Sequence, residues 1–191
     1  MLALAVALAE TLAVAHGQEL THAGVSPAAV LLAGDGPRLG CFGAVRAAAP
    51  DGAPRWEVPG LDPGSLAPEQ GAGGQSRPMG DVYVLGATLA YAATGHTTPE
   101  RWELPTVLRS LVVGCLARDP AHRPQLSDII GELASDSPTH SSTVASATGG
   151  GFGVGSRADP LLDAGWLPAR VVAAVVHRSA SVPAAEVQLS E

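Results

Sequence analysis

The stretch that decides the fold is Thr21–Arg46, with the sequence THAGVSPAAVLLAGDGPRLGCFGAVR. Within it, Val30–Leu32 and Arg38–Leu39 flank the dipeptide Asp35-Gly36. An Asp-Gly pair between two short strand-forming segments is typical of a tight β-hairpin. The sequence therefore predicts a small two-stranded hairpin at this point of the chain.

Helix-forming segments surround this hairpin, so the predicted fold class is mainly α with a small β-hairpin. Apolar, Ala- and Leu-rich runs that are bounded by Gly or Pro predict four helices. These helices cover Leu2–His16, Asp81–Thr94, Val107–Arg118 and Gln125–Leu133. Between the hairpin and the second helix, Ala44–Gly80 is dense in Pro and Gly and is predicted to be a long loop.

Three regions of different composition divide the chain. We expect a compact domain over residues 1–134, a low-complexity linker over 135–160 and a tail over 161–191. The linker contains the Ser/Thr/Gly run Ser135–Ser156, which cannot bury enough apolar surface to fold by itself. The tail is predicted to hold one short helix, Leu167–Ser179, with Pro168 in its first turn. Its apolar stripe consists of Val171, Val172, Val175 and Val176.

The composition argues against two kinds of partner. The net charge is −7, all 11 basic residues are Arg, and no basic stripe is present, so we expect no nucleic-acid partner. Cys41 and Cys115 form neither a disulfide framework nor a CxxC motif, and the six His residues have no ligand spacing. We therefore predict no metal site.

The apolar start of the chain resembles a targeting signal only superficially. Met1–Ala15 ends in Ala13-Val14-Ala15, but no Arg or Lys follows Met1 and Glu10 interrupts the apolar run. The run is also too short to span a bilayer. A buried helix is the favoured interpretation, with no membrane association and a cytoplasmic location.

Four groups of motifs occur in an order that indicates a known family. They are His22 with Phe42-Gly43, Ala67-Pro68-Glu69, DVYVLG at Asp81–Gly86 and CLARDPAHRP at Cys115–Pro124. In the same order they match the HRD and DFG segments, the APE motif, the DxxxLG opening of a central helix and a CLxxDPxxRP run. Residues 2–134 thus resemble the C-terminal lobe of Ser/Thr protein kinases, with those of high-GC, actinobacterial-type bacteria nearest. The tail run GWLPARVVAAVVHRSA resembles a segment found near the kinase domain of those proteins.

The resemblance implies structural roles for the family positions that this chain retains. Glu69 is expected to pair with Arg123, and Asp81 to bond the backbone around His22. The rings of His22 and Phe42 are expected to stack in an apolar spine. Gly43, the next residue, is retained as the Gly of the DFG match. The alternative is that these residues are ordinary surface charges and core packers.

The resemblance also implies that the family chemistry is missing. The position of the Asp that accepts the substrate proton is Gly24, and that of the loop Lys is Ser26. The metal-binding Asn is replaced by Ala29, and the metal-binding Asp of DFG by Cys41. ATP and Mg²⁺ are expected for an intact member of the family, whereas no cofactor is predicted for this chain, which contains no Lys and no Gly-rich phosphate loop before the catalytic-loop match.

We therefore expect a truncated, catalytically inactive Ser/Thr kinase homologue that acts as a protein-binding or regulatory module. The competing interpretation is a fragment of an active kinase whose nucleotide-binding lobe is encoded upstream or supplied by another chain; a decaying remnant without a role is a third. The expected partner is another kinase or protein, bound through the surface that faces the N-terminal lobe in the family. Apolar residues at the start of the chain are expected to contribute to this surface: Leu2, Leu4, Val6 and Leu8.

Overall fold

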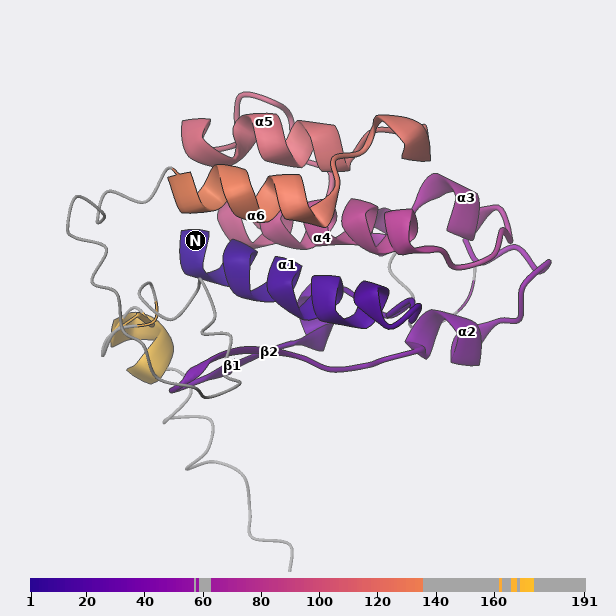
Figure 1. Cartoon of the computed structure of the whole chain (residues 1–191), viewed down its shortest axis with the longest axis horizontal. Helices are drawn as coiled ribbons and strands as arrows, with labels where there is room; N and C mark the ends of the chain where they lie inside the picture. The colour runs from indigo at the N-terminus through magenta and orange to yellow at the C-terminus, as the bar shows by residue number, and fades with distance from the viewer. Residues whose placement is uncertain (57, 59–62, 136–161, 163–165, 168, 174–191) are drawn as a thin grey trace, which may run out of the picture.

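The computed structural model describes residues 1–56, 58, 63–135, 162, 166–167 and 169–173. Its helices are α1 (Leu2–Gly17), α2 (Ala44–Ala48), α3 (Pro68–Gly71), α4 (Pro78–Thr94), α5 (Thr106–Cys115) and α6 (Leu126–Ser135). Its strands are β1 (Val30–Ala33) and β2 (Gly36–Leu39), and single 3-10 turns occur at Pro27–Ala29, Pro63–Ser65 and Pro120–His122. Figure 1 shows a helical body with one small hairpin along its edge. The predicted fold class, mainly α with a small β-hairpin, is confirmed.

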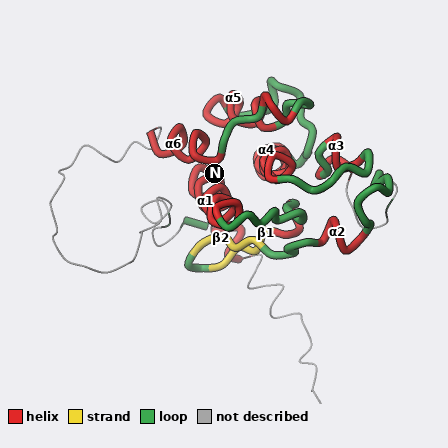
Figure 2. The backbone as a smooth tube through the Cα atoms, turned by 45° about the vertical axis from the view of Figure 1, so that its right-hand side comes forward, coloured by secondary structure: helices red, strands yellow, loops and turns green. Residues whose placement is uncertain are grey.

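Helix α1 lies at the centre of the packing. It contacts α6 and α4 on one side and β2 on the other, as Figures 1 and 2 both show. A helix that is covered on several sides has to be apolar nearly all round. The composition of α1 meets this requirement, since Ala5, Val6, Leu8 and Leu12 are completely buried.

The hairpin forms where the sequence predicts it, with a turn one residue earlier than expected. β1 and β2 pair antiparallel, with Ala33 opposite Gly36, so Gly34 and Asp35 make the turn. Gly36 therefore begins β2, where it adopts a φ of +132°. Only glycine takes up this backbone conformation readily, which explains why the Asp-Gly pair lies across the end of the turn.

The long-loop prediction for residues 44–80 is wrong in part, because the segment contains α2, α3 and the first turn of α4. Helix α4 begins at Pro78, three residues before the predicted start, with proline in its first turn as is common at helix N-termini. Helix α5 ends at Cys115, earlier than predicted. The carbonyl groups just beyond that end, those of Ala117 and Arg118, accept hydrogen bonds from the side chain of Arg123.

The predicted surface at the start of the chain is also wrong in part. Val6 and Leu8 are fully buried, and Leu2 and Leu4 are half-buried against the core. The reason is that α1 packs against α6, α4 and β2. No helix in the described part of the chain is long and apolar enough to cross a membrane.

The tail prediction is only partly testable. Residues 169–173 are helical, within the predicted helix Leu167–Ser179. Leu167, the first residue of that predicted helix, is not helical, and Ser135, the first residue of the predicted linker, is the last residue of α6. The other residues of both segments lie outside the described residues.

Candidate functional site

The loop between α1 and β1 is held by one carboxylate. Asp81, in the first turn of α4, is completely buried. Its Oδ2 accepts from the backbone N–H of His22 at 2.7 Å, and its Oδ1 from that of Ala23 at 2.9 Å. Oδ2 also lies 2.9 Å from Nε2 of His16. These bonds hold Ala23 at a φ of +50°, a left-handed conformation that non-glycine residues adopt only under constraint.

The rings of His22 and Phe42 meet edge to face, with centroids 5.0 Å apart at 66°. His22 is buried, and burial lowers its pKa although the nearby Asp81 carboxylate opposes the shift. Nδ1 of His22 has no hydrogen-bond partner among the described residues. Phe42, in contrast, is 57% exposed, so the expected buried spine ends at His22. The predicted contact between the rings is present, but the predicted burial of Phe42 is not.

The segment after β2 runs close against the loop. Gly43 N–H donates to the carbonyl of His22 at 2.7 Å, and Val45 N–H to that of Ala23 at 2.8 Å. Cys41 adopts a φ of +61°. Its carbonyl oxygen occupies the space that a Cβ atom at Gly24 would need. In this conformation, position 24 has no room for any side chain.

Of the four positions that the sequence matches to the family's catalytic residues, three come together and the fourth does not. Gly24, Ser26 and Cys41 line one pocket, whereas Ala29 is buried and does not line it. The Ser26 hydroxyl is occupied in capping the 3-10 turn, since its Oγ accepts from Ala29 N–H at 3.2 Å. The loop hydroxyl therefore has a local structural role.

The pocket has a volume of about 520 Å³, within the range of small-ligand sites. Residues 24–28, 41, 44–45, 65–66 and 91 line it. None of these lining residues is Asp, Glu, His, Lys or Arg, so the pocket offers neither a carboxylate base nor a fixed cation. Its ionisable groups are the exposed Cys41 thiol and the Tyr91 phenol. Mg²⁺ prefers hard oxygen ligands, and a thiol is a poor substitute.

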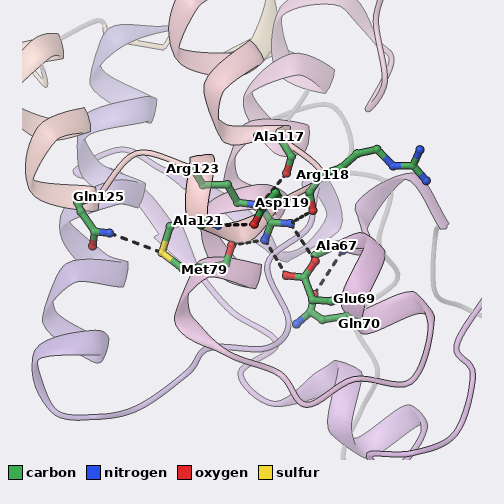
Figure 3. A network of polar contacts seen from close by, with 10 residues as sticks. All are labelled: Ala67, Glu69, Gln70, Met79, Ala117, Arg118, Asp119, Ala121, Arg123 and Gln125. Atoms are coloured by element: carbon green, nitrogen blue, oxygen red, sulfur yellow. Dashed lines mark hydrogen bonds and ion pairs between the residues drawn. The ribbon is translucent and has the colours of Figure 1, made fainter.

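The ion pair expected from the family, between Glu69 and Arg123, is formed. Nη1 of Arg123 lies 2.6 Å from one oxygen of Glu69, and Nη2 lies 2.8 Å from the other, a bidentate arrangement (Figure 3). The guanidinium also donates to the carbonyls of Met79, Ala117 and Arg118. Burial would raise the pKa of Glu69, but the hydrogen bond and charge of Arg123 outweigh it and hold the pKa below its ordinary value. The pair thus joins α3, α4 and the segment before α6.

A second buried arginine was not found by sequence reasoning. The Arg55 side chain is completely buried and donates to the carbonyls of Ala49, Gln70 and Gly74. Nη2 also forms a 2.7 Å ion pair with Asp51. Arg55 closes the Pro- and Gly-rich segment onto itself. Its partners are mostly backbone carbonyls, which leave no motif in the sequence.

No protein-family profile matches this chain. It is 36% identical over 153 residues to the probable serine/threonine-protein kinase PkwA of Thermomonospora curvata, a match that covers 70% of this chain and 20% of that protein. It is 30% identical over 199 residues to the serine/threonine-protein kinase AfsK of Streptomyces coelicolor, covering 95% of this chain and 23% of AfsK. It is 32% identical over 159 residues to the serine/threonine-protein kinase PknK of Mycobacterium tuberculosis, covering 71% of this chain and 14% of PknK. The chain therefore spans less than a quarter of the length of these relatives.

Proposed function

The chain belongs to the Ser/Thr protein kinase family through its homology to a segment of these bacterial kinases, and from this premise we propose that it is catalytically inactive and acts by binding protein. One observation supports the proposal above the others. The backbone at Gly24, where the family has its catalytic Asp, is in contact with the Cys41 carbonyl and leaves no room for a side chain. The loop is thus closed to the group that the reaction needs.

The missing base is the first chemical obstacle. Phosphoryl transfer to a hydroxyl needs a carboxylate that accepts the hydroxyl proton and orients the nucleophile. Gly24 has no side chain, and no described residue that lines the pocket has a carboxylate.

The missing charges are the second obstacle. The developing negative charge on the phosphoryl group is normally offset by metal ions and a Lys. Here the equivalent positions hold Cys41, Ala29 and Ser26, and the whole chain contains no Lys. These groups act together, so their losses cannot be summed, but losing them all removes the known means of stabilising the transition state.

The support for a binding role is that the structural contacts of the lobe are formed, whereas the matched catalytic positions hold Gly24, Ser26, Ala29 and Cys41. Asp81 still fixes the loop backbone, and Glu69 still pairs with Arg123. Both arrangements hold the shape of the lobe and its uncharged pocket without taking part in phosphoryl transfer. A rigid, preorganised surface loses little entropy when it binds a partner.

The catalytic half of the proposal is tested with labelled ATP. The purified chain is incubated with γ-labelled ATP, Mg²⁺ or Mn²⁺ and a generic protein acceptor, beside a heat-killed sample and an active kinase. We expect label only with the active kinase, and no change of melting temperature when ATP and Mg²⁺ are added. Label above the heat-killed sample, lost in an Asp81→Asn variant prepared in the same way, would contradict the proposal. Label of equal strength in that variant would identify a contaminating kinase.

The binding half is tested with a complete kinase of the same family as the probe. We expect a complex in analytical ultracentrifugation that Ala28→Trp weakens, because Ala28 lines the pocket and is exposed. Val113→Trp, at an exposed position on α5, is the matched control and should bind like the unmodified chain. Absence of a complex with the unmodified chain, or equal weakening by both variants, would count against this site.

The alternative is that this segment works as part of a longer phosphotransferase. It is favoured by the relatives, which are kinases more than four times as long as the matching segment. The four substituted positions argue against turnover in this form too. A labelled-ATP assay on a protein that joins this chain to a nucleotide-binding lobe of a relative distinguishes the two functions, since only the alternative predicts label.

A further inference from the structure

The described part of the tail contacts the turn of the β1–β2 hairpin. Nε1 of Trp166 donates to the carbonyl of Gly34 at 3.3 Å, across 132 residues of sequence. Leu162 packs against the hydrophobic core of the lobe, and its Cδ1 lies 3.0 Å from the place of a Cβ atom at Gly36. Figure 1 shows the described tail residues, in yellow, beside the hairpin.

Of the two glycines at the hairpin turn, Gly36 leaves room for a tail side chain. Gly36 has a φ of +132°, and a side chain added there would press against Leu162. A Cβ atom at Gly34 would meet nothing within 4 Å, so the contact there is made by the backbone carbonyl alone. Trp166 is half-buried, and an indole that covers apolar surface while its N–H meets a carbonyl is typical of recognition surfaces.

We propose that the turn of the β1–β2 hairpin is a docking surface for the tail of the same chain, which is anchored there by Leu162 and Trp166, and that other partners compete with these two side chains for the turn. The proposal does not depend on whether the lobe transfers phosphate. The valine stripe of the tail is not the anchor, because Val172 is 44% exposed and Val171 only half-buried. Val175 and Val176 lie outside the described residues.

The covalent link favours the chain's own tail over any free competitor. A tethered ligand acts at an effective concentration that reaches the order of mM when its tether can span the two sites. Leu31 and Leu32 of β1 are 60% and 41% exposed even with the tail in place. Release of the tail would therefore add to an apolar surface that the hairpin already offers.

The test uses the full chain with both anchors changed, Leu162→Glu together with Trp166→Ala. Hydrogen–deuterium exchange is followed in peptides from residues 30–39, with peptides from residues 78–94 as the internal reference for the folded lobe. We expect exchange at the hairpin turn to become several-fold faster and the reference to stay unchanged. Val172→Glu, an exposed position in the same tail segment, is the matched control and should behave like the unmodified chain.

Three results would overturn the proposal. The first is equal hairpin exchange in the double variant and the unmodified chain. The second is an equal effect of the Val172→Glu control. The third is that light scattering shows the unmodified chain to be a dimer while its hairpin is protected from exchange. The tail would then dock on the hairpin of a second copy. If the double variant disturbs the reference peptides, the milder Leu162→Ala and Trp166→Phe variants replace it, and the same three readings apply.

Discussion

At the scale of single residues, Arg55 and Arg123 show what a buried guanidinium does in this lobe. Each side chain is completely buried, and each binds a carboxylate and several backbone carbonyls from separate segments. A guanidinium presents its donors as a rigid planar fork, whereas a Lys ammonium is a compact point charge. The use of Arg alone in this chain therefore suits its two buried junctions, and Arg→Lys would not be a conservative change at either one.

Loss of the Glu69–Arg123 ion pair should destabilise the protein more than loss of an exposed ion pair. We expect Arg123→Ala to lower the free energy of unfolding by about 3 kcal/mol, because it leaves the part-buried Glu69 carboxylate and three backbone carbonyls without their donor. Arg38→Ala removes the ion pair between Arg38 and Asp35, whose two side chains are 65% and 67% exposed. This change should lower the free energy of unfolding by less than about 1 kcal/mol. Urea unfolding measures both. A double-mutant cycle of Glu69 and Arg123 that gives additive losses would show that the two side chains do not interact.

The depressed pKa of Glu69 predicts a pH dependence of this pair. Because the pKa in the folded state lies below its ordinary value of 4.5, the carboxylate adds stability above that pH and loses it as the pH falls. The difference in unfolding free energy between the unmodified chain and Glu69→Gln should thus be largest near neutral pH and shrink in acid. A difference that stays constant from pH 7 down to pH 3 would rule out the ionised pair as its source.

At the scale of elements, two helix glycines have opposite surroundings. Gly86 in α4 faces α5, where a Cβ atom would lie 2.5 Å from the Cβ of Cys115. Gly131 in α6 has nothing within 4 Å of its Cβ position. The first glycine therefore sets how closely two helices approach, and the second has no such role.

The same substitution should have opposite effects at these two glycines. Gly131→Ala is expected to stabilise the protein by about 0.5–1 kcal/mol, since alanine loses less backbone entropy in a helix. Gly86→Ala is expected to destabilise it by about 1–3 kcal/mol, because α4 and α5 would be forced apart. Thermal and urea unfolding of the two variants check this. Equal shifts of the same sign would contradict the packing of α4 on α5.

At the scale of the whole molecule, the reactivity of one thiol reports on the folded lobe and that of the other on its opening. Cys41 is exposed, while Cys115 is buried and burial raises its pKa to about 12. We expect a thiol reagent at pH 8 to label Cys41 rapidly and Cys115 only when the lobe opens, so that the slow rate follows the free energy of unfolding. A Cys41→Ser variant isolates the slow phase. Rapid labelling of that variant under native conditions would show that the core around Cys115 is open.

The sequence predicts the elements that composition alone determines, and it misses those that depend on tertiary contacts. Helix α1 was predictable because its apolar residues surround the helix, as a central position requires. The single turns α2 and α3 were not, since so short a helix is stable only through contacts such as those of Arg55. The burial of Val6 and Leu8 could not be predicted, because nothing in the sequence indicates which elements pack against α1.

The candidate site was predictable as a set of positions and not as a geometry. The motifs located Gly24, Ser26 and Cys41, and the structure brings these three around one pocket. The overlap between position 24 and the Cys41 carbonyl depends on backbone angles, including the φ of +61° at Cys41, that no residue type reveals. The separation of Ala29 from the pocket could not be foreseen for the same reason.

The central place of α1 affects the order in which the chain can fold during synthesis. α1 ends at Gly17, while its neighbour α6 begins at Leu126. At ordinary rates of translation, roughly ten seconds pass between the emergence of one and of the other. Throughout that time a helix that is apolar nearly all round lacks its main cover, and contacts between such distant segments form slowly. The ribosome-bound chain is therefore a natural client for a chaperone that holds apolar segments until α6 arrives.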